Sequence, residues 1–578
     1  MKRLLFLILL LSSATFAQFL KSDPLDIARR IADRVISETV FELKETELKP
    51  DQYLQTLDFP KVFSNNISGK AIAISMIKAR KDTTLSYGIS YSSPVKVWAN
   101  HNSVYENRKN ISFYFKEIAY SVFSFQDTFC INLKKGENRV VVCAALHEMP
   151  VIFLREITGA EEKPFSEFLN PMTAKTGLSH WLYLPPGKLP NEDEGALWDL
   201  FDSLRGGSLK DSFADFPAQK ERKLIIHSKA TFKKDSFADW NYPNGILMMT
   251  MSNLYKATQD EKYKDFLKNY CTFISNNISI ARRQYFEDHN IRGLFYRIFR
   301  KSMLDDAGAP ALPFIELALL DAANRRDSLV TEMVHYVFNE QLRLPDGTFC
   351  RPEPEEGTVW ADDLFMSVPL LLRAGLLYNN PEYSQEAVKQ VLNFNKYLFD
   401  KSIKLYKHGY FSNSNRTSEV FWGRANGWVL WATSELLIKL PKDNPSYKLI
   451  EQNFVSHLEG ILQAQDNSGL WHQVLDDKTS FEETSCTAMF ITALARAIIN
   501  GSISNNKSEC IFRAWNALLK KVDTDGIVKD ICCGTGIGYT KEFYNSRQRF
   551  NSDPRGLGAV ITAAIEVDRL NKYLEGIK

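Results

Sequence analysis

The stretch Thr358-Val-Trp-Ala-Asp-Asp-Leu-Phe-Met-Ser-Val-Pro369 places an acidic pair directly after a tryptophan and directly before a long apolar run. From Leu364 onward the apolar residues predict a buried helix. Burying a carboxylate is costly unless another group pairs with it. Asp362 and Asp363 at the start of this helix therefore indicate either a pairing within the fold or a functional site at the helix N-terminus.

Either aspartate has a simpler explanation as a helix cap, because a side chain at this position often accepts backbone N–H groups. For one aspartate taken alone, capping is the more frequent role. A partly buried carboxyl also has a raised pKa, which suits a general acid, and the flat face of Trp360 can cover the CH groups of a sugar ring. Both interpretations stay open at this point.

The same helical spacing recurs through the C-terminal part of the chain. Helices separated by about 30 residues, with long and short loops in alternation, are typical of helical hairpins arranged in a double ring. We predict an all-α (α/α)6 barrel with the motif-bearing loops at one end. The segments with i, i+3, i+4 apolar spacing are 246–256, 262–278, 311–322, 328–338, 364–377, 384–398, 426–440, 446–465, 486–500 and 556–574.

The N-terminal part has a different pattern. Residues 26–41 predict one amphipathic helix, and from about residue 70 to residue 156 an apolar period of two predicts short strands, which favours a β-sandwich-like domain. A stretch rich in Pro, Gly, Asp and Ser follows and predicts a linker. The predicted parts are a signal peptide at 1–17, a mainly β accessory domain with a leading helix at 18–186, a linker at 187–222 and the helical barrel at 223–578.

The first 17 residues combine two basic residues, a short apolar run and small residues before Gln18, which is typical of a secretory signal peptide. We expect an exported protein, periplasmic or extracellular, without membrane insertion once the signal is removed. The net charge of +2 does not indicate a nucleic-acid partner. Eight cysteines without a C-x-x-C pair predict neither a disulfide framework nor a metal site, and we expect no cofactor.

Four clusters in the helical part combine paired acids, indoles and an arginine on separate loops. Each has a simpler explanation, because paired acids can cap helices, Arg424 can bridge helices and Trp471 can lie in the core. Together they suit an acidic sugar better than a nucleotide or a metal, since a guanidinium pairs well with a carboxylate. The clusters are Ser302-Met-Leu-Asp-Asp-Ala-Gly-Ala309, the opening stretch, Phe421-Trp-Gly-Arg-Ala-Asn-Gly-Trp428, and Ser468-Gly-Leu-Trp-His-Gln-Val-Leu-Asp-Asp477 with Glu483-Thr-Ser-Cys-Thr-Ala-Met489.

In this order the clusters resemble the unsaturated rhamnogalacturonyl hydrolases of glycoside hydrolase family 105 and, more distantly, the unsaturated glucuronyl hydrolases of family 88. The matching patterns are W-x-D-x-x-x-M, F-W-G-R-x-N-G-W, G-L-W-x-Q-V-L-D and E-T-S-x-T-A-M-F, within about residues 225–575. The resemblance implies an (α/α)6 fold and an acidic oligosaccharide substrate of the pectin or rhamnogalacturonan type. It also implies removal of a terminal 4,5-unsaturated uronic acid by hydration of the C4=C5 double bond.

The resemblance further implies which residues form the site. Asp362 matches the general acid/base of the family and Asp305 its second acid, with Asp306 a near rival in the same loop. A single carboxyl that protonates C4 must start protonated, so we expect the pKa of Asp362 to be raised by burial and by nearby acids. The predicted substrate-binding residues are Trp240, Tyr242, Asp306, Arg351, Trp360, His408, Trp422, Arg424, Trp428 and Trp471.

Two positions depart from the family pattern. Where the family often has Phe-Trp-His-Lys, this chain has Phe349-Cys-Arg-Pro352, and Asp-x-His-Gly becomes Asp553-Pro-Arg-Gly556. An arginine cannot act as a base at ordinary pH, so Arg351 and Arg555 bear on substrate preference more than on activity. The alternatives are another uronate-active enzyme of the same fold, a glucuronidase or a lyase, and a non-catalytic saccharide-binding protein.

Overall fold

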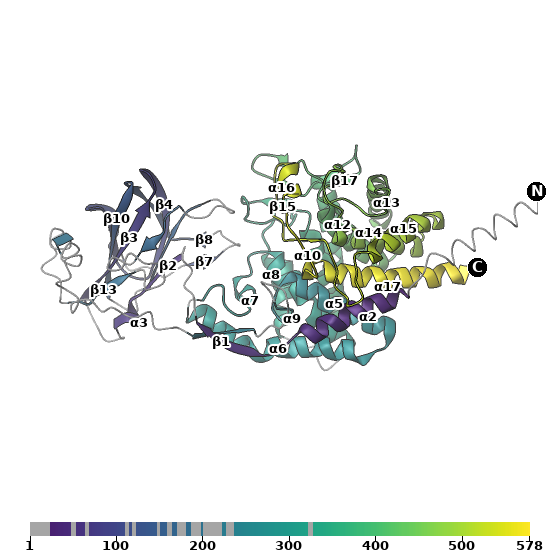
Figure 1. Ribbon diagram of the computed structural model, residues 1–578, viewed down its shortest axis with the longest axis horizontal. Helices are drawn as coiled ribbons and strands as arrows, with labels where there is room; N and C mark the ends of the chain where they lie inside the picture. Colours follow the sequence, from purple (N-terminus) through teal and green to yellow (C-terminus); the bar gives the residue numbers. More distant parts are fainter. Residues whose placement is uncertain are drawn as a thin grey trace, which may run out of the picture. The chain divides into compact units, whose positions relative to one another are not determined.

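The structure is a computed structural model that describes residues 23–47, 54–63, 69–109, 115–117, 123–146, 151–158, 165–169, 181–186, 198–199, 222–226, 236–288, 290–321 and 328–577. The chain forms two compact units, one of residues 1–44 and 225–578 and one of residues 45–224. The first unit is built mainly of helices and the second of strands (Figure 1). Within the described residues, no helix is long and apolar enough to cross a membrane.

Six of the described helices form the inside of the helical unit. Each packs against the next along the chain, and the last packs against the first. Almost every residue of α8 and α12 is buried, which is typical of helices that are enclosed on all sides. These inner helices are α5 (Tyr242–Thr258), α8 (Leu304–Leu320), α10 (Asp363–Tyr378), α12 (Gly423–Lys439), α14 (Thr484–Ile499) and α17 (Pro554–Ile577).

Glycines allow the inner helices to approach one another closely. A Cβ atom on Gly245 would lie 2.1 Å from the carbonyl oxygen of Ala309, and one on Gly308 would lie 1.8 Å from that of Met366. Helix α8 begins at Leu304, before the predicted start at residue 311, and it contains Pro310 and Pro313. The sequence pattern missed this first part because glycine and proline normally argue against a helix interior.

A second set of helices packs on the outside of the first. In α15 the buried residues, among them Ile511, Trp515 and Leu518, lie on one face, as expected for a helix with one side exposed to water. Five of these helices follow the inner helix on which they pack. They are α6 (Glu261–Phe286), α9 (Ser328–His335), α11 (Pro381–Leu398), α13 (Tyr447–Ala464) and α15 (Ser508–Leu519).

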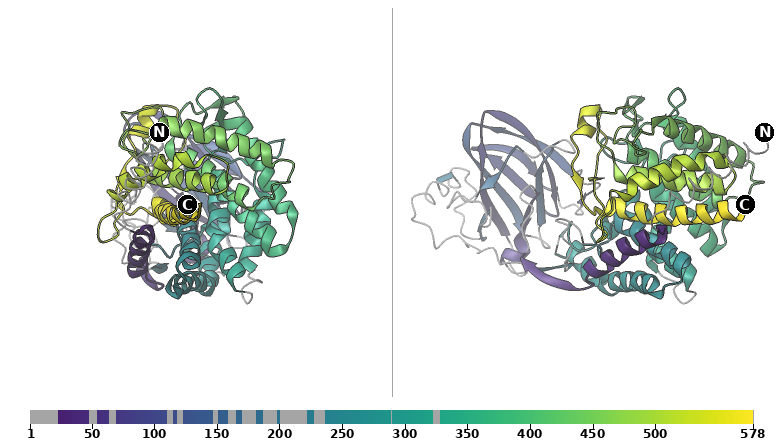
Figure 2. Two further views of the ribbon diagram at one scale, coloured as in Figure 1. Left: turned by 90° about the vertical axis from the view of Figure 1, so that its right-hand side faces the viewer. Right: turned by 45° about the vertical axis from the view of Figure 1, so that its right-hand side comes forward.

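The leading helix α2 (Pro24–Glu38) belongs to the helical unit, so the predicted domain boundary, which assigned it to the accessory domain, was wrong. It packs along α17 (Figures 1 and 2), with Ile31 and Val35 in the core of that unit. The physical reason is that α2 has one apolar face, and α17 has no following helix among the described residues to cover it. The predicted signal peptide, and the predicted linker apart from residues 198, 199 and 222, lie outside the described residues.

The unit of residues 45–224 consists mainly of two antiparallel sheets, with strand orders β2-β11-β4-β9 and β12-β3-β10-β5-β6. Apolar residues of both sheets, such as Ile89, Val97 and Ile152, form one core. The strands are β2 (Leu54–Asp58), β3 (Gly69–Ala79), β4 (Thr83–Tyr91), β5 (Val95–Ala99), β6 (Asn102–Asn107), β9 (Asp127–Leu133), β10 (Gly136–Leu146), β11 (Val151–Glu156), β12 (Phe168–Leu169) and β13 (Leu182–Leu184), which also pairs with β3.

Short elements complete the fold. In the loops of the helical unit they are α7 (Arg297–Arg300), η2 (Tyr336–Glu340), β15 (Thr358–Trp360), β16 (Phe399–Asp400), β17 (Leu405–Tyr406), β18 (Gly409–Phe411), β19 (Arg416–Thr417), η3 (Asn505–Lys507), β20 (Ile531–Cys532), α16 (Lys541–Asn545) and β21 (Arg549–Phe550). The others are β1 (Leu43–Glu47), α3 (Phe59–Phe63), β7 (Lys116–Glu117), β8 (Phe123–Ser124) and β14 (Arg222–Ile226). Strand β18 pairs with β15 and β19.

A ring of alternating charges connects the inner helices about three turns after their N-terminal ends. Every inner helix contributes one member, and the members line a cavity of about 620 Å³. The ion pairs are Lys256–Glu316 at 2.7 Å, Glu316–Arg373 at 2.5 Å, Arg373–Glu435 at 3.1 Å, Glu435–Arg496 at 3.2 Å and Arg496–Glu566 at 2.8 Å.

The charge ring predicts how the helical unit responds to acid. Burial raises the pKa of Glu316 and Glu435, but Arg373 and the other basic neighbours lower the pKa of each to about 2. Because the folded pKa lies below the unfolded value, this stability is present above about pH 4.5 and is lost as the pH falls towards 2. We expect the urea midpoint of the helical unit to fall in that window. A midpoint that stays constant there would contradict the role of the ring.

Candidate active site

Polar side chains gather where the inner helices begin. The charges of Arg555, Arg424, Asp305 and Asp362 all act on the pKa of Tyr242. Residues at the starts of five inner helices therefore lie close together. Tyr242 and Asp362 are partly exposed, whereas Arg424 is buried. Helix N-termini carry partial positive charge and favour bound anions. The site therefore favours a ligand with a negatively charged group.

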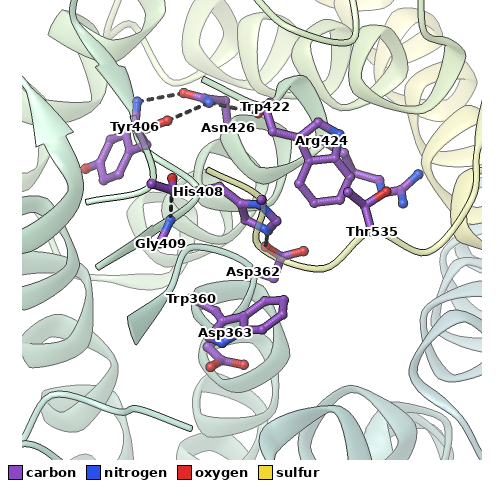
Figure 3. Close-up of polar contacts among 12 residues, drawn as sticks. Trp360, Asp362, Asp363, Tyr406, His408, Gly409, Trp422, Arg424, Asn426 and Thr535 are labelled. Carbon is purple, nitrogen blue, oxygen red and sulfur yellow. Dashed lines mark hydrogen bonds and ion pairs between the residues drawn. The ribbon is translucent and has the colours of Figure 1, made fainter. Parts of the chain in front are cut away.

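Asp362 stands at the N-cap position of α10, yet its side chain accepts no hydrogen bond from the backbone of the described part of the chain. The capping explanation therefore does not account for this residue. Its Oδ2 atom lies 3.1 Å from Nε2 of His408, and Figure 3 shows the imidazole directed at the carboxyl group. The contact is at ion-pair distance but lacks hydrogen-bond alignment, and no other described group hydrogen-bonds either atom.

The predicted rise in the pKa of Asp362 was wrong in direction. Burial raises the pKa, but His408, together with Arg351 and Arg424, lowers it more, and the net result lies below the ordinary value. Asp363 does not add the expected repulsion, because its carboxyl group turns away from Asp362 (Figure 3) and pairs with Arg351 at 2.6 Å. In the unliganded protein Asp362 is thus a carboxylate that faces a histidine.

Asp305 and Asp306 have different surroundings, which distinguishes the two rivals. Asp306 pairs with Arg300, and its Oδ2 accepts the backbone N–H of Ser302 at 3.2 Å. Asp305 instead lies within the electrostatic reach of Asp362 and pairs with Arg351 at 2.8 Å. Asp305 therefore belongs to the site, whereas the charge of Asp306 is compensated by Arg300.

Arg351 connects the two acids beside Asp362. Its guanidinium donates to Asp305 at 2.8 Å and to Asp363 at 2.6 Å, and it lies 4.5 Å from the ring centroid of Trp360. Burial raises the pKa of Asp363 to about 6 despite this arginine. Arg351 is only 2% exposed, so its contacts are those of a residue that holds acids in place rather than one that presents its charge to a ligand.

Arg424 and Trp422 lie near His408 (Figure 3). The Nη atoms of Arg424 donate to the carbonyl oxygens of Cys532 and Cys533, both at 2.6 Å, while Trp422 lies 4.5 Å from the His408 ring. Neither Nε of Arg424 nor Nε1 of Trp422 has a hydrogen-bond partner among the described residues. Both side chains are only 1% exposed, so these N–H groups lie buried beside the site and do not face solvent.

Three predicted indoles are not brought to the site. Trp240 is fully buried and donates its N–H to the carbonyl oxygen of Asp306 at 2.7 Å. Trp428 packs against Phe365, and Trp471 donates to the carbonyl oxygen of Ile461 at 2.7 Å. Each has about 1% exposure or less, so none offers a face on which a sugar could stack, and the core explanation that was open for Trp471 applies to all three.

Three residues that shape the site were not among the predicted site residues, although Glu483 begins one of the motifs that the sequence singled out. Tyr544 contacts His408 at 2.7 Å, and Glu483 accepts the N–H of Cys532 at 2.9 Å and so holds the segment that binds Arg424. Burial raises the pKa of Glu353 to about 7. Glu353 lies two positions after Arg351 in a polar loop, and nothing in the local sequence marks it as a site residue. Tyr544 lies 136 residues from His408, so no local motif connects the two.

The arrangement is suited to proton transfer next to an anionic group. A carboxylate and an imidazole face each other at the start of a helix, and two arginines stand beside them. Among the described residues, no group of three or more His, Cys, Asp or Glu side chains could hold a metal ion.

Comparison with known proteins gives matches over the helical part. The family model described as Glycosyl Hydrolase Family 88 matches residues 218–571. The unsaturated rhamnogalacturonyl hydrolase of Bacillus subtilis is 27% identical over 365 residues, which cover 60% of this chain and 94% of that protein. An unsaturated 3S-rhamnoglycuronyl hydrolase of an Alteromonas species is 26% identical over 327 residues, with 55% and 74% covered.

Solved structures agree in fold. A glycoside hydrolase from family 105 of C. acetobutylicum matches with a TM-score of 0.51 and 22% identity, over 58% of this chain and 96% of that one. A possible member of the same family from Salmonella enterica matches with a TM-score of 0.50 and 22% identity, over 60% and 86%. At this identity the likeness concerns the fold, and the helical unit has the fold of these proteins.

Proposed function

Since the chain belongs to glycosyl hydrolase family 88, we propose that it removes a terminal 4,5-unsaturated uronic acid from oligosaccharides that polysaccharide lyases produce. The inner helices, which pack in cyclic order, would form an (α/α)6 barrel together with the outer helices, with the active site at the N-terminal ends of the inner helices. The proposal rests on the carboxylate of Asp362, which caps no backbone N–H of the described residues and has its Oδ2 atom 3.1 Å from Nε2 of His408.

The chemistry requires one proton donor and one water molecule. A proton is added to C4 of the vinyl ether, and positive charge develops at C5 and the ring oxygen. Water then adds to C5 and returns a proton to the protein, after which the hemiketal opens and releases the neighbouring sugar. This route differs from hydrolysis by two separated carboxyl groups, because one carboxyl can give the first proton and take the second. We assign both steps to Asp362.

The surrounding residues support this assignment. Arg351, which pairs with Asp305 at 2.8 Å and Asp363 at 2.6 Å, fixes the acids beside Asp362 and compensates their charge. Nε of Arg424 and Nε1 of Trp422, which have no hydrogen-bond partner among the described residues, would donate to the carboxylate and hydroxyl groups of the uronate. Helix N-termini add favourable potential for the same carboxylate.

The names of the two relatives guide the choice of substrate. Both names describe a uronyl group together with rhamnose. We propose oligosaccharides of the pectic, rhamnogalacturonan type, in which the unsaturated uronate precedes rhamnose. We also propose export to the periplasm or the extracellular space, on the basis of the N-terminal 17 residues. Sequencing the N-terminus of the mature protein would test that export, with a start at Gln18 expected.

A screen with lyase-generated oligosaccharides tests the function. The conjugated double bond absorbs ultraviolet light, and we expect the purified protein to abolish this absorbance, fastest with rhamnogalacturonan fragments. Fragments of glycosaminoglycans and of ulvan-type polysaccharides serve as comparisons. A gain of absorbance on intact polysaccharide would indicate a lyase, and release of a saturated uronate would indicate a glucuronidase. Binding without any change in absorbance would indicate a saccharide-binding protein. Each of these three results would overturn the proposal.

A further inference from the structure

We propose that Arg555 binds the carboxylate of the unsaturated uronate together with Arg424, so that two guanidiniums share one acid group of the substrate. This inference deepens the proposed function and rests on it, because it names a residue that recognises the charge of the terminal sugar. Arg555 is then a specificity-determining residue, which distinguishes a free acid from an ester or a neutral sugar.

Arg555 is held at the start of an inner helix. It is the second residue of α17. Its backbone N–H donates to Oδ1 of Asp553 at 2.9 Å, and its Nη1 donates to both carboxylate oxygens of Asp553 at 3.0 Å. Asp553 is only 1% exposed, so it fixes the guanidinium in place. The start of a helix favours a bound anion, and the guanidinium adds a full positive charge at this point.

The three arginines near Asp362 differ in their exposure. The side chain of Arg555 is 23% exposed, whereas Arg424 and Arg351 are buried. Arg351 donates to two acids of the protein itself, as described above. Of these three arginines, Arg555 is therefore the one whose side chain a ligand contacts when it enters from solvent.

Arg555 and Arg424 lie against the same short segment of the chain. The Nη atoms of Arg424 donate to the carbonyl oxygens of Cys532 and Cys533, both at 2.6 Å. A Cβ atom on Gly534, the next residue, would lie 3.2 Å from Nε of Arg555. The missing side chain at position 534 thus allows Arg555 to approach the segment that holds Arg424, and guanidiniums from α12 and α17 become neighbours.

The electrostatics of the site agree with this placement. Burial raises the pKa of Tyr242, while the charges of Arg555 and Arg424 lower it. Burial and the charge of Arg555 also oppose the charged form of Arg424, although the pKa of Arg424 is raised overall. Two like charges that are held near each other repel, and an anion that binds to both relieves this repulsion. A carboxylate is suited to this role because it accepts several hydrogen bonds from guanidiniums.

Binding of the uronate carboxylate here also favours protonation of the catalytic acid. Burial raises the pKa of Asp362, but His408, Arg351 and Arg424 lower it further. A carboxylate bound by Arg424 and Arg555 offsets the effect of Arg424 on Asp362 and adds a negative charge to the site. Both changes raise the pKa of Asp362 in the complex, which is the direction that a proton donor requires.

The variant Arg555→Gln tests the proposal by kinetics, because glutamine removes the charge and keeps a side chain that can donate to Asp553. We expect KM for an unsaturated oligosaccharide with a free carboxylate to rise roughly tenfold to a hundredfold, the range of one hydrogen bond to a charged group. The value of kcat should stay within about threefold of wild type, because the interaction that is lost serves binding.

The methyl ester of the same oligosaccharide separates charge recognition from a structural role. The ester lacks the negative charge, so its KM should change by less than about twofold in Arg555→Gln. The preference of the wild type for acid over ester should therefore shrink in this variant. A matched control is Arg549→Gln, because Arg549 is exposed and pairs with Asp530 at 3.4 Å, and this variant should keep the preference. An unchanged preference in Arg555→Gln would overturn the proposal, whether or not overall activity falls.

A second measurement needs no turnover and therefore distinguishes this inference from the proposed function. Calorimetry with galacturonate, and with galactose as the neutral comparison, measures recognition of the carboxylate alone. We expect wild type to bind galacturonate more tightly than galactose and Arg555→Gln to lose this difference. Equal results for the two proteins would overturn the inference even if the enzyme is active. Binding of galacturonate that depends on Arg555, without turnover of any unsaturated oligosaccharide, would instead refute the proposed function.

Discussion

Asp362→Asn is expected to lower kcat by about 10³–10⁴-fold, near the upper end of what general acid–base catalysis contributes. An amide can neither give a proton to C4 nor accept one from water. KM and Kd should change little, because Asp362 lies at the reacting bond and the proposed contacts to the uronate come from Arg424 and Trp422. Loss of ultraviolet absorbance at saturating substrate measures the effect, and calorimetry with the inactive variant measures binding.

The fold should survive this substitution. Asn has nearly the same shape as Asp, and the side chain caps no backbone N–H of the described part of α10, so the thermal midpoint should stay close to that of wild type. Asp443→Asn is the matched control, because Asp443 is exposed in the loop between α12 and α13, and it should keep full activity. Turnover of Asp362→Asn within tenfold of wild type would exclude Asp362 as the proton donor.

Arg373→Met is expected to lower the free energy of unfolding of the helical unit by about 3–5 kcal/mol, because removing one partner from a buried ion pair leaves uncompensated charge. Arg373 is buried between Glu316 and Glu435, at 2.5 Å and 3.1 Å. Methionine keeps much of the apolar stem, so the loss reports charge rather than volume. Urea unfolding followed by tryptophan fluorescence measures the change.

The pH dependence of this loss separates charge from packing. In wild type the pKa values of Glu316 and Glu435 are lowered to about 2, and without Arg373 both should rise. The deficit of the variant should therefore be largest at neutral pH and shrink as the pH falls below about 4.5. Lys572→Met removes an exposed ion pair with Asp568 and should cost no more than about 1 kcal/mol. A deficit that does not depend on pH would assign the effect of Arg373 to packing.

Motifs in the sequence were informative about position but less so about the direction of side chains. The motif Phe421-Trp-Gly-Arg-Ala-Asn-Gly-Trp428 brings Trp422 and Arg424 to the site, yet Trp428 packs into the core against Phe365. Consecutive helical residues point in directions about 100° apart. The choice between Asp305 and Asp306 therefore depended on Arg300 and Arg351, whose places the local sequence does not reveal.

The sequence by itself determined the helical and strand periods, the order of the motifs and the acid at position 362, because these properties depend on residues close together in the chain. The tertiary structure decided where α2 packs, which acid pairs with which arginine, and that the pKa of Asp362 is lowered. It also brought Tyr544 to His408 across 136 residues. These outcomes depend on how groups far apart in the sequence are placed, because hydrogen bonds require the right distance and angle and electrostatic interactions depend on distance and burial.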